Sequence, residues 1–147
     1  MGLDMYLTKE IYVGANYKHN GVRGEINLTT NGMPIKINLN KVVSIQESFA
    51  YWRKANQIHN WFVKNVQKGV DDCGTYYVSA EKLQKLVETC KEVLDNHELA
   101  EELLPTCSGF FFGDTKYDEY YFEQLQDTVD MLSDIDEECD YMYHASW

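Results

Sequence analysis

Apolar residues recur at two different intervals along this chain, and these intervals predict its elements. Near the start, Leu3, Met5 and Leu7 alternate with polar residues between Met1 and Val13. A period of two is typical of a strand with one buried face. We therefore predict a half-buried strand over the first 13 residues.

A β-hairpin is predicted around Asn31-Gly32, because this dipeptide favours a two-residue type I′ turn. In that register Thr30 opposes Met33. The apolar pairs Leu28 with Ile35 and Ile26 with Ile37 then share one face of the sheet. Pro34 has no N–H group, so either the strand from Met33 to Leu39 lies at a sheet edge or the Pro34 nitrogen faces outward.

The segment Glu47 to Gln67 is predicted as the central helix, ending near Gly69. At about 100° per residue its apolar side chains fall in one arc, and they are Tyr51, Trp52, Ala55, Ile58, His59, Phe62, Val63 and Val66. Trp61 lies outside this arc. It either packs on a second element or marks a contact surface.

Two more helices are predicted. One starts after the N-cap residue Ser79 and is interrupted at Asp95-Asn96, before a short helical turn that Pro105 ends. The other starts at Thr115 or Asp118. Their apolar faces are formed by Leu83, Leu86, Val87, Cys90, Val93 and Leu94, and by Tyr121, Phe122, Leu125, Val129 and Leu132.

Short strands are predicted at Thr75–Val78, at Phe110–Phe112 and in the last residues, YMYHASW, which are expected to close the sheet. Together these elements predict an α+β fold, an antiparallel sheet packed on one side by about three helices. Residues 1–147 are expected to form a single domain, since the length is that of one ordinary hydrophobic core.

The net charge of −11 is concentrated in one segment. Residues 118–140 contain ten acidic side chains and no Lys or Arg, whereas the rest of the chain carries 14 acidic and 13 basic residues. We expect no direct binding of nucleic acid, because recognition of phosphates needs a basic patch.

The cysteines at positions 73, 90, 107 and 139 include no CxxC pair. This spacing argues against a zinc ribbon and a redox motif, so free thiols are expected. The first ten residues carry three charges, which does not fit a signal peptide or a membrane span. A cytoplasmic protein with no membrane partner is therefore expected.

Five segments together resemble a group of small bacteriophage and prophage proteins of uncharacterised function: MGLDMYL, YWRKANQIHNWFV, YYVSAEKL, LLPT and GFFFGDTKYDEYY. The segments are spread over most of the chain. The resemblance implies a phage accessory protein that acts in the cytoplasm of the infected host cell. It does not imply an activity, and it carries over no catalytic residues.

Five acidic side chains fall within about 80° of arc on the last predicted helix, opposite its apolar face: Glu119, Glu123, Asp127, Asp130 and Asp134. Either this stripe is a solvated face that keeps the protein soluble, or it presents carboxylates to a basic groove as nucleic-acid phosphates would. The second interpretation predicts a counter-defence inhibitor. It would occupy the nucleic-acid-binding surface of a host defence protein.

A second hypothesis places a ligand site on aromatic residues of the central helix and the strand that follows. Trp52, His59 and either Tyr76 or Tyr77 would stack a base, and Arg53 would pair a phosphate. The protein would then sequester a nucleotide-like immune signal, or act on it as a small nucleotide-processing enzyme. The simpler interpretation of His59 is a core residue with one hydrogen bond.

Catalytic and cofactor motifs are absent from the sequence, which lacks GxGxxG, GxxxxGK(S/T), GxSxG and HExxH. Asp71-Asp72 could contact a cation, but adjacent carboxylates point apart. We therefore predict neither catalytic residues, nor a cofactor, nor a metal. Homodimer formation through Trp61 or the edge strand is left open.

Overall fold

The computed structural model describes residues 2–14, 27–38 and 41–147. Its strands are β1 (Asp4–Tyr12), β2 (Thr29–Thr30), β3 (Met33–Pro34), β4 (Ser44–Arg53), β5 (Thr75–Val78) and β6 (Asp140–Ser146). Its helices are α1 (Asn56–Asn65), α2 (Ala80–Asp95), the 3-10 helix η2 (His97–Leu99), α3 (Ala100–Leu103) and α4 (Glu119–Met131). The fold is α+β, as predicted.

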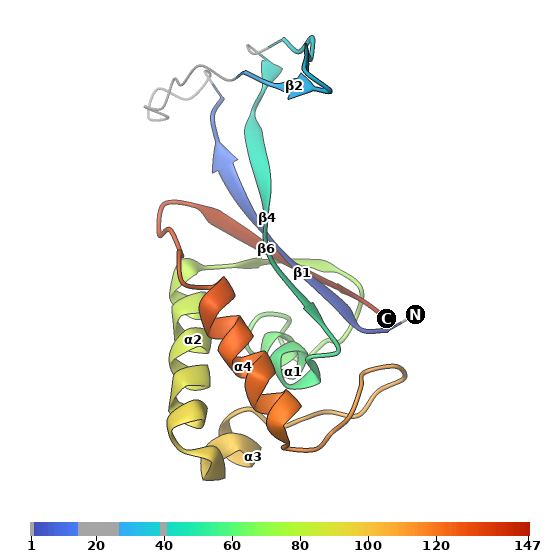
Figure 1. Cartoon of the computed structure of the whole chain (residues 1–147), viewed down its shortest axis with the longest axis vertical. Helices are drawn as coiled ribbons and strands as arrows, with labels where there is room; N and C mark the ends of the chain where they lie inside the picture. Colours follow the sequence, from blue (N-terminus) through green and yellow to red (C-terminus); the bar gives the residue numbers. More distant parts are fainter. Residues whose placement is uncertain (1, 15–26, 39–40) are drawn as a thin grey trace.

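Four strands form one antiparallel sheet in the order β4-β1-β6-β5, and the helices lie against one face of it (Figure 1). Because successive side chains of a strand point to opposite faces, each strand buries alternate residues against the helices. The buried strand residues are Met5, Leu7, Ala50, Trp52, Val78, Tyr141, Tyr143 and Ala145. They share one core with buried helical residues that include Ile58, Phe62, Leu83, Leu86, Cys90, Val93, Tyr121 and Leu125.

The strands predicted at the two chain ends are confirmed, and they are neighbours in the sheet. Met5 opposes Ala145, and Leu7 opposes Tyr143. The last strand therefore lies in the interior of the sheet and does not close its edge. Edge positions belong to β4 and β5.

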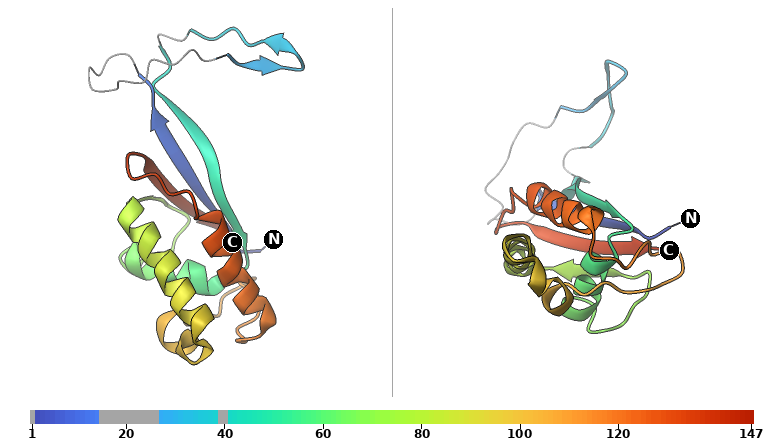
Figure 2. Two further views of the ribbon diagram at one scale, coloured as in Figure 1. Left: turned by 60° about the vertical axis from the view of Figure 1, so that its left-hand side comes forward. Right: turned by 60° about the horizontal axis from the view of Figure 1, so that its bottom comes forward.

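The predicted hairpin forms, with Thr30 opposite Met33 and a hydrogen bond of 2.8 Å from the Ile35 N–H to the Leu28 carbonyl. Asn31 and Gly32 both have a positive φ, as a type I′ turn requires. The prediction that the hairpin belongs to the main sheet is wrong. The hairpin forms a separate two-stranded sheet that projects away from the helices (Figure 2). Ile26 and Leu39 lie outside the described residues.

The predicted helix over Glu47–Gln67 is wrong in its first third, which belongs to β4. Here Ala50 and Trp52 are buried and Tyr51 is exposed, which is the alternation of a strand. The same apolar residues also fit a helical arc. Over so few positions, the spacing of apolar residues therefore does not distinguish a strand from a helix. The pairing of β4 with β1 along its whole length decides the outcome.

The helix proper, α1, is shorter than predicted at both ends. Lys54 has a φ of +57° and separates β4 from α1, a conformation that the sequence does not predict for a lysine. α1 ends at Asn65, and Gly69 lies beyond it with a φ of +82°. Trp61 is 7% exposed and packs edge-on against Phe62, so it belongs to the core.

The predicted strand at Phe110–Phe112 is also wrong, because this segment is a turn. Phe110 is 80% exposed, and Phe112 is the buried member of the three. The Phe111 carbonyl accepts a hydrogen bond of 3.3 Å from the N–H of Leu3, the residue before β1. The other two helices form as predicted, with Ser79 and Asp118 as their N-caps. In the described residues, every helix is too short or too polar to cross a membrane.

Candidate functional site

The acidic stripe is carried by α4, which is held rigidly against the rest of the molecule. Asp118 caps its start, where Oδ1 accepts a hydrogen bond from the Tyr121 N–H at 3.2 Å. On the buried side, the Trp52 indole N–H donates to the Thr128 hydroxyl at 2.9 Å. The Gln57 amide donates to Gln124 Oε1, also at 2.9 Å. These bonds tie α4 to β4 and α1, so the opposite face of α4 has a fixed orientation.

That opposite face presents the carboxylates. Glu119, Glu123, Asp127 and Asp130 lie on α4, Asp134 lies in the turn that follows, and all five are exposed. Among the described residues, the five take part in no salt bridge, and Asp130 accepts a hydrogen bond from Gln126 at 2.9 Å. We call these five residues the acidic face. Its charge is not neutralised by the described Lys and Arg side chains, so it is available to a partner.

Trp52 and Arg53 of the second predicted site lie close to the acidic face. They line a hollow of about 190 Å³ between β4 and α4, together with Tyr51, Tyr120 and Asp127. The Arg53 guanidinium is 59% exposed and lies 3.9 Å from Asp4. The hollow thus combines aromatic rings with one cation, but it also contains the Asp127 carboxylate.

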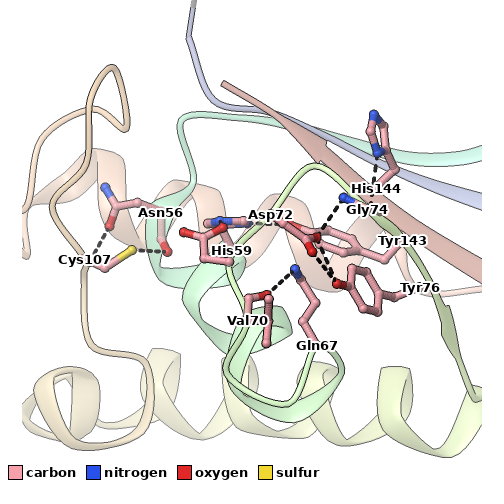
Figure 3. A network of polar contacts seen from close by, with 11 residues as sticks. Asn56, His59, Gln67, Val70, Asp72, Gly74, Tyr76, Cys107, Tyr143 and His144 are labelled. Carbon is pink, nitrogen blue, oxygen red and sulfur yellow. Dashed lines mark hydrogen bonds and ion pairs between the residues drawn. The ribbon is translucent and has the colours of Figure 1, made fainter.

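His59 lies elsewhere, at the centre of a buried polar network (Figure 3). Its ring is fully buried, with Nε2 3.0 Å from Asp71 Oδ1 and Nδ1 2.8 Å from the Tyr143 hydroxyl. A neutral imidazole satisfies both contacts, because Nε2–H donates to the carboxylate and Nδ1 accepts from the tyrosine. The network joins α1, the loop before β5, and β6.

Burial controls the charge of this network. It lowers the pKa of His59 below its usual value, and the nearby Asp71 carboxylate offsets this effect only in part. Burial also raises the pKa of Tyr143 well above its usual value. Both groups are therefore neutral near pH 7, and His59 is a core residue with two polar partners.

Tyr76 and Tyr77 occupy two further environments. The Tyr76 hydroxyl donates to Asp72 Oδ1 at 2.8 Å, and this hydrogen bond raises the pKa of Tyr76. Tyr77 is 57% exposed and lines a different hollow, beside Glu81 and Glu137. The structure thus brings Trp52 and Arg53 together but separates them from His59 and from the two tyrosines.

Cys107 and Asn56 form the part of the network that sequence reasoning did not identify (Figure 3). Asn56 Oδ1 accepts from the Cys107 N–H at 3.0 Å, and its Nδ2 donates to the carbonyls of Phe112 and Asp114. Burial raises the pKa of the Cys107 thiol to about 11, so it stays protonated near pH 7. Both ring nitrogens of His59 have other partners, so His59 is not placed to take a proton from the Cys107 thiol and activate it as a nucleophile.

The sequence offered little signal for this network, because its members are distant in the chain. His59 is 12 residues from Asp71 and 84 from Tyr143. Over residues 2–14, 27–38 and 41–147, the structure has no cluster of three His, Cys, Asp or Glu side chains that could hold a metal ion. Comparison of the chain with protein-family models, curated proteins and solved structures gives no match.

Proposed function

We propose that this protein is a phage-encoded accessory protein that inhibits a host defence protein by binding it. The acidic face would engage the basic surface with which the host protein binds nucleic acid. One observation carries the proposal: four exposed carboxylates on one side of α4, and a fifth, Asp134, in the turn after it, have no salt bridges among the described residues.

The geometry of the acidic face supports imitation of a nucleic-acid backbone. Glu119, Glu123 and Asp127 are four residues apart, so their positions repeat at about 6 Å along the helix. A regular row of negative charges presents a basic groove with much the same field as a row of phosphates. Because α4 is fixed by its buried hydrogen bonds, little conformational entropy is lost on binding.

The chain's resemblance to phage proteins supports the setting of this proposal, the cytoplasm of an infected bacterium. The charge distribution supports a protein partner over nucleic acid, since the net charge of −11 repels phosphates. A small binding protein also needs no catalytic constellation, in keeping with the protonated Cys107 and the enclosed His59.

The test is affinity capture of host proteins by the tagged protein and by the variant Glu123→Lys/Asp127→Lys/Asp130→Lys. We expect a nucleic-acid-binding host protein to be captured by the native chain and lost with the variant. The matched control is Glu92→Lys/Glu98→Lys/Glu101→Lys, which makes the same charge change at exposed sites outside the acidic face. Equal capture by both variants would contradict the proposal.

A second candidate function rests on the hollow beside Trp52 and Arg53. The exposed rings of Tyr51 and Tyr120 could stack a base there, while Arg53 pairs a phosphate. The protein would then sequester a nucleotide-like signal. Asp127 in the same hollow opposes an anionic ligand, which is why we rank this function second.

A thermal-shift series with mono- and cyclic nucleotides tests the second function. A ligand that binds the folded state raises the melting temperature with its concentration, and Arg53→Ala should abolish the rise. Recovery of the nucleotide in altered form would instead indicate a small nucleotide-processing enzyme. No shift with any nucleotide would rule out sequestration of this class of ligand.

A further inference from the structure

The projecting hairpin exposes apolar side chains that the body of the protein does not cover. We define the arm as residues 27–38 and 41–45, which include β2 and β3. Every residue from 27 to 38 is exposed. The arm's large exposed apolar side chains are Leu28, Met33, Ile35, Ile37, Val43 and Ile45. Several large apolar side chains exposed on one projecting element are a candidate interaction surface.

The arm also carries a positive charge, although the protein as a whole is acidic. Residues 27–46 contain Lys36 and Lys41 and no Asp or Glu, while the whole chain has a net charge of −11. A partner for the arm therefore needs both apolar and acidic groups. Nucleic acid fits poorly, since the remainder of the chain repels phosphates.

A surface with these two properties lies along α2. Two hollows, of about 420 and 350 Å³, adjoin at Gln84, which lines both and donates to Glu137 at 3.1 Å. We call them together the trough. Its apolar lining includes Val87, Val129, Leu132 and Ile135. Its carboxylates are Glu81, Glu88, Asp130, Glu137, Glu138 and Asp140, against the single cation Lys91.

The arm cannot fill the trough of its own chain, because it projects away from the helices (Figures 1 and 2). Figure 1 and the left panel of Figure 2 place the arm at the end of the body where α2 begins. Two copies can therefore approach through this end. Each copy carries one arm and one trough. If each arm docks in the trough of the other copy, the assembly is complete with two copies, and no arm or trough is left unoccupied.

From this complementarity we propose that the protein forms a homodimer in which the arm of each copy docks in the trough of the other. The apolar residues of the arm cover the apolar lining, and Lys36 and Lys41 face the carboxylates. Asp130 belongs to both the acidic face and the trough, whereas Glu123 and Asp127 do not line the trough. The double variant Glu123→Lys/Asp127→Lys therefore separates a failure of this proposal from a failure of the proposed function.

The test is sedimentation of the full chain across the micromolar range, with charge-swapped variants. The arm variant is Lys36→Glu/Lys41→Glu. The trough variant is Glu81→Lys/Glu88→Lys/Glu137→Lys/Glu138→Lys, which leaves two carboxylates and five lysines in the lining. We expect the native chain to dimerise, and each variant alone to do so about tenfold more weakly, since facing like charges repel. An equimolar mixture should recover dimers, because both interfaces of the mixed pair join opposite charges.

Lys64→Glu/Lys68→Glu is the matched control for the arm variant, since it makes the same charge change at exposed sites on the body. It should leave the dissociation constant unchanged. Circular dichroism checks that each variant is folded. A native chain that stays monomeric, a dimer that neither variant weakens, or a mixture that fails to associate would each overturn the proposal.

Discussion

The polar network around His59 and the acidic face of α4 both gather ionisable side chains, but in opposite ways. In the network, each ring nitrogen of His59 has a partner, and burial keeps the imidazole neutral. On the acidic face, five carboxylates point to solvent without salt bridges among the described residues. The polar groups of the network are paired with one another, whereas the carboxylates of the acidic face are exposed to solvent.

The largest expected loss of stability comes from mutation of the polar network around His59. His59→Ala removes two hydrogen bonds, leaves the Tyr143 hydroxyl buried without its partner, and opens a cavity in the core. We expect a loss of about 3 kcal/mol in the free energy of unfolding, measured with urea. A loss below about 1 kcal/mol would mean that the network does not support the fold.

A smaller loss is expected for Asn56→Ala, which removes the three hydrogen bonds that hold the loop from Cys107 to Asp114. We expect about 2 kcal/mol, because the loop carbonyls regain water in part. Asn60→Ala is the matched control, since Asn60 makes one such bond, to the Pro105 carbonyl at 2.9 Å. If the two variants lost equal stability, Asn56 would not be the anchor of this loop.

The pH dependence of stability follows from the lowered pKa of His59. Because the unfolded state binds this proton more readily, the contribution is complete above about pH 6.5 and is lost as the pH falls below that value. The slope for this single group is at most about 1.4 kcal/mol per pH unit. Urea unfolding between pH 7.5 and 5.5 measures it, and His59→Gln should flatten the dependence.

Asp136 gives a separate acid-labile contribution. The Glu138 N–H bond lowers the pKa of Asp136 from 3.8, so its contribution is complete above that value and is lost as the pH falls through the lowered pKa. As the pH falls, the His59 contribution begins to be lost near pH 6.5, and the Asp136 contribution begins to be lost only near pH 3.8. A His59→Gln variant that kept the full dependence between pH 7.5 and 5.5 would contradict our assignment of the upper window.

The smallest expected effect is on the acidic face. Glu123→Gln/Asp127→Asn removes like charges one helical turn apart, so the free energy of unfolding should stay the same or rise by a few tenths of a kcal/mol. Thermal and urea unfolding both measure this. A clear loss of stability would show that these carboxylates have structural partners, and the contrast with the network would disappear.

The sequence predicted elements whose signal is local, and failed where contacts distant in the chain decide. Thr75–Val78, the cap at Ser79 and the Asn31-Gly32 turn all have strong local preferences and were confirmed. Residues 47–53 of β4 were predicted as helix because their apolar residues also fit a helical arc, but pairing with β1 makes them a strand. Phe110–Phe112 was misread because a run of three apolar residues does not specify a neighbouring strand.

The same distinction applies to the candidate sites. The acidic face needs only the period of one helix, so the sequence located all five residues and the structure places four of them on α4. The aromatic site needed a fold to bring its residues together. Trp52 was placed on the same helix as His59, but it lies on a strand and faces α4 instead. The partner of His59 on β6, 84 residues away, had no local signal.

The central claim is that the acidic face replaces nucleic acid on the host protein. Its most direct test is displacement of a fluorescent duplex from the captured host protein, followed by anisotropy as this protein is titrated. We predict that the native chain and His59→Gln displace the duplex at the same concentrations, while Glu123→Lys/Asp127→Lys/Asp130→Lys does not displace it. Binding of the native chain while the duplex stays in place would contradict the claim.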